Sequence, residues 1–385
     1  MKRLLTAASM LALAASAAWA EPVKIGVITT LSGPPGYIGE QIRDAMLLAA
    51  ETNGGKLGGV DVEFVVEDDA LKPPTGLQIA QKFINDEGIR LVTGIVFSNV
   101  AGATVPEVVD SGAIYISPNA GPSNLAGEGC HENYFVVSWQ NDSLHEASGA
   151  AAKALGYTRA VALAPNYQAG QDAIAGFKRL FEGEVTEIFT QLDQTDFASE
   201  MAQIRAANPE VVFQFHPGGL GIAFLKQYQQ AGLLGAIPMV LSEPSIDGVI
   251  LNAVGEAAIG IKGTTHWNED FDNEASKAFV AAWRAKYGDR PITYYAQQAW
   301  DTALLIGAAL EKTGGGDGVD ALREALRTVE WTSTRGDFAW GPNQHPVQDW
   351  YMVDIVAGEG GKPVARTGDK LRDDVGDIYA ANCRM

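Results

Sequence analysis

The residues best placed for chemistry are hydroxyl, amide and aromatic side chains in the loops that follow predicted strands. In open α/β sheets, ligands bind outside the carboxyl ends of the strands, where such loops lead into helices. The sequence predicts eight such loops, and none of them contains Lys or Arg: 32–38, 68–71, 97–99, 117–123, 165–170, 216–219, 242–245 and 264–267. We therefore expect a bound carboxylate to be held by Ser and Asn side chains and by backbone N–H groups at helix N-termini.

Sequence motifs of common enzyme classes are absent. The chain has no P-loop, no dinucleotide-binding glycine pattern, no nucleophile elbow and no H-E-x-x-H or C-x-x-C motif. The histidines show no spacing typical of metal ligands: His131, His145, His216, His266 and His345. We predict no catalysis, no metal and no cofactor. A hydrolase with a triad assembled from distant loops stays open as an alternative, because triads are defined by geometry.

Composition excludes several classes of partner. The chain has 385 residues, 47 acidic and 28 basic, with a formal net charge of −19. Such a charge repels nucleic-acid phosphate and anionic membrane surfaces. The length favours two domains, since a single core of this size is uncommon.

The first twenty residues have the pattern of a secretory signal. Lys2 and Arg3 precede an apolar stretch that ends near Ala18, and a small-x-small site predicts cleavage after Ala20. We therefore expect an exported, periplasmic protein. Separately, we expect it to be a monomer. In an oxidising compartment we expect Cys130 and Cys383 to pair, with two unpaired buried thiols as the alternative.

Two series of alternating strands and helices must position the loops. The first covers 24–116, and the second runs from just after Trp139 to 264. This alternation predicts mostly parallel sheets with helices on both faces. Three helices within 273–327 cannot all cover the second sheet, so we expect the chain to cross back to the first. Candidate hinge segments are 138–141, 262–267 and 341–346.

Several short motifs occur in an order that resembles a known family. They are Lys24-Ile25-Gly26-Val27, Leu31-Ser32-Gly33-Pro34, Gly94 to Ser98, Ile116-Ser117-Pro118, Asn166-Tyr167 with Gly170, Gln230-Ala231-Gly232-Leu233, Phe279, Tyr287-Gly288 and Tyr295 to Asp301. Together they make the sequence similar to the leucine/isoleucine/valine-binding proteins, the extracytoplasmic solute receptors of ABC importers.

This resemblance implies an α/β fold with two Rossmann-like lobes, three hinge crossings and a ligand cleft between the lobes. Lobe 1 is predicted as 21–139 plus 266–342, and lobe 2 as 140–265 plus 343–385. The implied function is capture of a small carboxylate-bearing ligand by lobe closure and its delivery to permease subunits. An exported ligand-sensing module without transport is the alternative.

The resemblance also implies roles for single residues. Ser98 matches the hydroxyl that takes the ligand carboxylate. Asn119 and Gly121, on either side of Ala120, match positions that supply a backbone carbonyl for an ammonium and a Thr for the carboxylate. Because Gly121 has no hydroxyl, only a backbone N–H remains there. Glu243 matches the acid that pairs with the α-ammonium of an amino acid.

Other positions depart from the amino-acid binders. Ala169 stands where a Tyr is common, and 213–217 replaces a Tyr-Gly-Gly stretch. These departures resemble the branch that binds aromatic carboxylates. The ligand is therefore predicted to be either an amino acid or an aromatic acid. The remaining predicted ligand-binding residues are Tyr37, Tyr167, Phe215, His216 and Trp267.

Each of these roles has a structural alternative. Ser98 could serve only as a helix N-cap. The others could be packing or hydrogen-bonding groups: Tyr37, Tyr167, Phe215, His216 and His266. For the two histidines we favour the structural role.

Glu243 discriminates between the two ligand classes. Burying a carboxylate without a cationic partner costs several kcal/mol or forces it to take a proton. An amino acid supplies that partner through its ammonium, whereas an aromatic acid would repel the charge. If the ligand has no amine, we predict that Glu243 turns away or pairs with another group, with His216 as the candidate.

Overall fold

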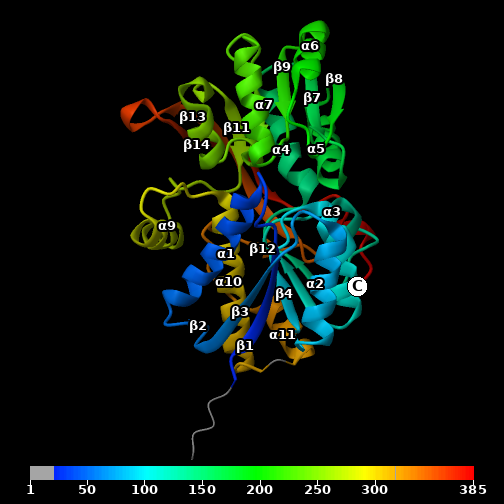
Figure 1. Ribbon diagram of the computed structural model, residues 1–385, viewed down its shortest axis with the longest axis vertical. Coiled ribbons are helices and arrows are strands. Elements are labelled where there is room, and N and C mark those ends of the chain that lie inside the picture. Colours follow the sequence, from blue (N-terminus) through cyan, green and yellow to red (C-terminus); the bar gives the residue numbers. More distant parts are fainter. Residues whose placement is uncertain (1–20, 317) are drawn as a thin grey trace, which may run out of the picture.

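The computed structural model describes residues 21–316 and 318–385 (Figure 1). The predicted secretory signal, residues 1–20, lies outside the described residues. None of the described helices is both long enough and apolar enough to cross a membrane. Two sheets, each with its own helices, are stacked along the long axis of the molecule (Figure 1).

A six-stranded sheet forms the centre of what we call lobe 1, in the order β2-β3-β1-β4-β5-β6. All neighbours in it are parallel except the short β2 beside β3. Its strands are β1 (Val23–Thr29), β2 (Lys56–Leu57), β3 (Val60–Asp68), β4 (Leu91–Thr93), β5 (Ile114–Ser117) and β6 (Tyr134–Val136).

Helices cover both sides of this sheet, with α1 and α10 on one side and α2 and α3 on the other (Figure 1). They are α1 (Gly36–Glu51), α2 (Pro73–Asn85), α3 (Ser98–Asp110), α9 (Glu274–Tyr287), α10 (Tyr294–Thr313) and α11 (Val319–Thr328). Helix α10 packs against α1, so the chain returns to lobe 1 after it has built most of the other lobe.

The second sheet forms the centre of lobe 2. Parallel strands β8-β7-β9 are joined by a single bridge, between Val212 and Met239, to the run β10-β11-β13-β14. The strands are β7 (Arg159–Pro165), β8 (Glu184–Thr190), β9 (Val211–Gln214), β10 (Val240–Ser242), β11 (Lys262–Thr265), β13 (Pro346–Ala357) and β14 (Pro363–Val375), and β12 (Ala339–Trp340) pairs with the start of β13. The helices are α4 (Asn141–Ala154), α5 (Gln168–Phe181), α6 (Ala198–Ala207), α7 (Gly219–Gln230) and α8 (Gly248–Val254).

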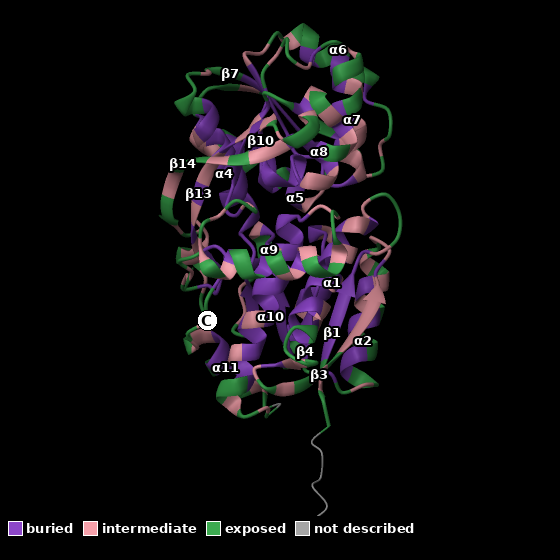
Figure 2. Ribbon diagram, turned by 90° about the vertical axis from the view of Figure 1, so that its left-hand side faces the viewer, coloured by how far each residue is buried: buried purple, intermediate pink, exposed green. Residues whose placement is uncertain are grey.

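The buried apolar residues are divided between the lobes. One core cluster fills lobe 1, and two smaller clusters lie on the faces of the second sheet. Figure 2 shows buried residues inside both lobes and also where the lobes face each other. This arrangement confirms the predicted α/β fold with two lobes.

Three segments of the chain cross between the lobes, between β6 and α4, between β11 and α9, and between β12 and β13. A buried arginine joins the first crossing to the beginning of β13. Arg335 Nη1 donates to the carbonyl of Ser138 at 3.2 Å and to Gln348 Oε1 at 2.6 Å. The crossings also touch through aromatic rings, since Trp139 and His266 meet edge to face at 5.4 Å.

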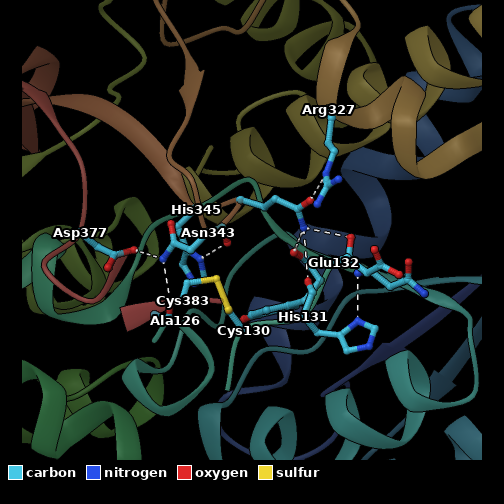
Figure 3. The surroundings of a disulfide bond; sticks show 12 residues. Ala126, Cys130, His131, Glu132, Arg327, Asn343, His345, Asp377 and Cys383 are labelled. Carbon is cyan, nitrogen blue, oxygen red and sulfur yellow. Dashed lines mark hydrogen bonds between the residues drawn. A yellow bond between two sulfur atoms is a disulfide. The ribbon is translucent and has the colours of Figure 1, made fainter. Parts of the chain in front are cut away.

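The C-terminal tail provides a further connection. Lobe 2 was predicted to include all of 343–385, but only the chain up to the end of β14 lies in its sheet. Cys383 forms a disulfide with Cys130, which precedes β6 in lobe 1 (Figure 3). Asn343 Nδ2 donates to Asp377 Oδ2 at 2.6 Å and to the carbonyl of Ala126 at 2.9 Å (Figure 3). These contacts hold the tail against lobe 1.

Candidate functional site

A small cavity of about 30 Å³ lies between the lobes. Five of the predicted ligand-binding residues line it: Ser98, Asn119, Tyr167, Ala169 and Phe215. The first two come from lobe 1 and the other three from lobe 2. The described residues that line the cavity include no Asp, Glu, Lys or Arg.

Ser98 is the first residue of α3 and presents a hydroxyl to the cavity. It is not the helix N-cap, because Phe97 holds that position and no side chain caps the helix. Asn141 Nδ2 donates to Ser98 Oγ at 3.1 Å. Within the described chain the Ser98 hydroxyl hydrogen has no acceptor, so it can serve an oxygen of a ligand.

Asn119 contributes a buried amide to the same side of the cavity. Its Nδ2 donates to the carbonyl of Val96 at 2.6 Å, and its Oδ1 has no partner among the described residues. Its backbone carbonyl, the group predicted to accept from a ligand ammonium, already accepts from Ser138 Oγ at 2.7 Å.

The lobe 2 side of the cavity is aromatic. Tyr167 and Phe215 stack with ring centroids 6.4 Å apart and planes 14° from parallel. Ala169, in the first turn of α5, adds only a methyl group to this wall. An aromatic ring held between the lobes would therefore meet flat apolar surfaces.

Among the described residues that line the cavity, His145 is the only histidine, and it belongs to lobe 2. It lies on α4, and its ring meets Phe215 and Phe213 edge to face at 4.8 and 5.5 Å. Nδ1 of His145 shares a hydrogen bond of 2.9 Å with Ser242 Oγ. Burial lowers the pKa of His145 to about 3, so the ring is neutral at physiological pH.

Gly121 and Ala120 do not line this cavity. A Cβ on Gly121 would lie 1.9 Å from the carbonyl oxygen of Trp139, so glycine is required by the close passage of the first crossing. The Gly121 N–H, predicted to be available to the ligand, donates instead to Asn141 Oδ1 at 3.2 Å. The carbonyl of Ala120 accepts from Ser117 Oγ at 2.7 Å.

Glu243 does not line the cavity; it lines a larger groove of about 580 Å³, to which residues of both lobes contribute. Its Oε1 is 2.6 Å from His266 Nδ1, and its Oε2 accepts from the Thr265 hydroxyl. The prediction of His216 as its alternative partner is wrong. Ser242 and Thr264 are paired in the parallel strands β10 and β11, which brings the residues just after them together.

His216 is held elsewhere in lobe 2. Its Nε2 is 3.0 Å from Thr190 Oγ1 and its Nδ1 is 2.8 Å from Gln214 Oε1. Its ring stacks on Phe224 at 4.8 Å. The structural role that we favoured for this histidine accounts for both of its nitrogens.

Tyr37 and Trp267 also lie outside the cavity. The Tyr37 hydroxyl donates to Asp247 Oδ2 at 2.6 Å, which joins α1 of lobe 1 to the start of α8 in lobe 2. Asp247 Oδ1 caps α8 through the N–H of Val249 at 2.7 Å. Trp267 lines the groove, and its Nε1 donates to Ser276 Oγ at 2.9 Å.

Sequence reasoning did not select several residues that line the cavity, chiefly Trp139, Asn141, His145 and Tyr295. The predicted site lies in loops after strands, whereas Asn141 and His145 lie in the first turns of α4. Their spacing of four residues puts them on one helical face, a signal that the sequence did contain. Within the described chain, no group of three or more potential metal ligands is close enough to hold an ion.

Comparison with known proteins gives consistent matches. A family model described as periplasmic binding protein matches residues 22–362. A Leu/Ile/Val-binding protein homologue from Brucella melitensis is 29% identical, over 94% of this chain and 95% of the relative.

Solved structures resemble the chain over nearly its whole length. The solute-binding protein of an ABC transporter from R. palustris, in complex with benzoate, is 32% identical with a TM-score of 0.88, covering 94% of this chain and 100% of that one. A second, from Rhodopseudomonas palustris BisB5 with 3,4-dihydroxybenzoic acid, is 28% identical with a TM-score of 0.86, covering 93% and 99%.

Proposed function

Because the chain belongs to the periplasmic binding protein family, we propose that it captures an aromatic carboxylate in the cavity between its lobes. The protein is a solute-binding receptor of the ABC transporter type, for amino acids or aromatic acids. The choice of an aromatic acid, release from a signal after Ala20, action as a monomer and delivery to permease subunits are parts of the proposal.

The observation that carries this choice is the absence of a carboxylate among the described residues that line the cavity. An amino acid bound there would bury its ammonium without a counter-charge, which costs several kcal/mol. Glu243, the acid that could supply the charge, is engaged by His266 and Thr265. An aromatic acid has no ammonium and needs no such partner.

The cavity does offer groups for a carboxylate. Ser98 begins α3 and Ala169 lies in the first turn of α5, so both helices direct their N-termini to the cavity. The first N–H groups of a helix lack partners within it and carry partial positive charge. Together with the Ser98 hydroxyl they can hold an anion without Arg or Lys.

Binding is coupled to lobe movement in this proposal. The cavity of about 30 Å³ is far below the roughly 300 Å³ of a typical small-molecule site, so the lobes must separate to admit a ring. Contacts from both lobes then favour the closed arrangement over the open one. Two similar proteins were solved with benzoate and 3,4-dihydroxybenzoic acid, which supports an aromatic ligand.

Calorimetric titration of the ligand-stripped protein tests this proposal. We expect binding of benzoate-type acids and none of leucine or phenylalanine, and we expect the acids to be recovered chemically unchanged. Glu243→Gln is the control variant, and its affinity for the aromatic acids should stay within about twofold of the parent, a change below 0.5 kcal/mol. Binding of amino acids that is lost in Glu243→Gln would contradict the proposal.

A further inference from the structure

Two kinds of polar group line the cavity. The Ser98 hydroxyl and the N-termini of α3 and α5 suit an anion. His145, whose ring meets Phe213 and Phe215 edge to face, adds an imidazole. Asn141 touches Ser98, and His145 follows four residues later on α4, about 6 Å further along the helix axis. This rise between the two positions on α4 is comparable with the length of an aromatic ring.

One ring nitrogen of His145 has no hydrogen-bond partner among the described residues. Nδ1 is occupied by Ser242, and no hydrogen bond to Nε2 is formed by the described residues. The side chain is 1% exposed and lines the cavity. A cavity-lining nitrogen without a hydrogen-bond partner is available to a polar group of a ligand.

A neutral hydroxyl suits this nitrogen better than a carboxylate does. The charged groups near His145 on α4 and its neighbours are paired with one another, since Glu146 binds Arg179 of α5 at 2.6 Å and Arg372 of β14 at 2.8 Å. Asp142 binds Arg179 at 2.9 Å. The imidazole therefore has no charged partner, and a phenolic hydroxyl can serve either of its tautomers because it both donates and accepts.

We propose that Nε2 of His145 hydrogen-bonds a hydroxyl group on the ligand's aromatic ring, so that the protein prefers hydroxylated aromatic acids to benzoate. This inference rests on the proposed function, because it requires an aromatic acid with its carboxylate at the Ser98 side. The hydroxyl is expected at the meta or para position, away from the carboxylate.

Titration of the parent protein with benzoate, 3-hydroxybenzoate and 4-hydroxybenzoate is the first test. At least one hydroxylated acid should bind about tenfold more tightly than benzoate, within the 5- to 150-fold range expected when a buried group gains or lacks its partner. Equal or tighter binding of benzoate would overturn the inference and leave the proposed function intact. If none of the three acids binds, the proposed function itself fails.

Variants then assign the preference to His145. In His145→Phe the preference for the hydroxylated acid over benzoate should fall to within about twofold. His145→Gln keeps a polar group and should retain part of the preference. His216→Phe is the matched control, because His216 is equally buried in lobe 2 but does not line the cavity. The inference would be overturned if the preference for the hydroxylated acid survived in His145→Phe. It would also be overturned if Asn119→Leu removed this preference and His145→Phe did not.

A spectroscopic measurement separates contact from a general packing effect. Nitrogen chemical shifts of the His145 ring should change at Nε2 when the hydroxylated acid replaces benzoate, whereas those of His216 should not. Unchanged His145 shifts on exchange of the two ligands would contradict a hydrogen bond to the ring hydroxyl.

Discussion

The cavity between the lobes and the groove beside it differ in both size and charge. The groove, about 580 Å³, is lined by five acids, Glu243, Asp247, Glu269, Asp289 and Glu359, next to Arg284 and Lys362. The cavity, about 30 Å³, has neither acids nor Lys or Arg among its described lining residues.

Their hydrogen bonding also differs. In the groove, Glu243 is bound by His266, and Asp247 is bound by Tyr37 and the first turn of α8. In the cavity, the Ser98 hydroxyl hydrogen has no acceptor among the described residues, and neither Asn119 Oδ1 nor His145 Nε2 has a hydrogen-bond partner there. The buried acids Glu243 and Asp247 of the groove are therefore engaged by neighbouring side chains, although the Tyr294 hydroxyl there has no partner in the described chain. In the cavity, groups from both lobes are available to a ligand.

Filling the cavity should give the largest effect. The Ala169→Trp side chain would occupy the space between the lobes, and we expect the affinity for aromatic acids to fall at least 100-fold, about 3 kcal/mol. The same change in the groove, Asn252→Trp, should leave affinity within about twofold of the parent, below 0.5 kcal/mol. Titration calorimetry on folded samples measures both. A reversed pattern would make the groove the binding site.

The pH dependence of stability should reveal the structural role of Asp247. Burial raises the pKa of Asp247 to about 6 from 3.8. Because the folded pKa lies above the unfolded one, its contribution to the free energy of unfolding is full below pH 4 and is lost as pH rises through 6. The expected loss is about 2–3 kcal/mol.

Urea unfolding of the parent and of Asp247→Asn between pH 4 and pH 7.5 measures this loss. The difference in unfolding free energy between the two proteins should change across that interval in favour of the variant at high pH. A constant difference would mean that the carboxyl group titrates normally in the folded state.

The variant Glu243→Gln tests whether this groove residue contributes to the stability of the protein or to its affinity for the ligand. Replacing the carboxylate weakens its hydrogen bonds to His266 and Thr265, so we expect the free energy of unfolding to fall by about 1–2 kcal/mol. Denaturant unfolding with and without benzoate measures this. A loss of stability that appears only in the presence of ligand would assign Glu243 to the binding site instead.

Ser98→Ala should give the smallest effect on the cavity side. Loss of one hydroxyl donor should weaken aromatic-acid binding about 5- to 10-fold, near 1 kcal/mol, because the helix N-termini continue to hold the carboxylate. Ser123→Ala, in the neighbouring network with Asp172, is a control that leaves the Ser98 hydroxyl in place. Equal losses in both variants would point to lobe packing as the cause.

The fold could be predicted from the sequence because it depends on repeated local patterns. Alternating strands and helices fix parallel sheets, and the loops after strands indicate which end of each sheet meets a ligand. Ser98 and Tyr167 reach the cavity for this reason, since each lies where a strand leads into a helix.

Contacts between distant segments decide the rest of the site. Glu243 pairs with His266 because β10 and β11 are neighbouring strands. Position 121 requires glycine because the backbone of Trp139 passes close to it. Tyr37 is fixed by Asp247, far away in the chain and in the other lobe. The register of strands and the approach of the two lobes set these pairs, and neither leaves a local pattern in the sequence.

The disulfide limits how far the two lobes can separate. β14 moves with lobe 2, whereas Cys383 is fixed to lobe 1, so residues 376–382 must absorb any separation of the lobes. A segment of this length reaches at most about 25 Å when fully extended. The disulfide and this segment therefore set an upper limit on the separation of the lobes. Reduction of the bond would remove that limit without breaking any of the three crossings.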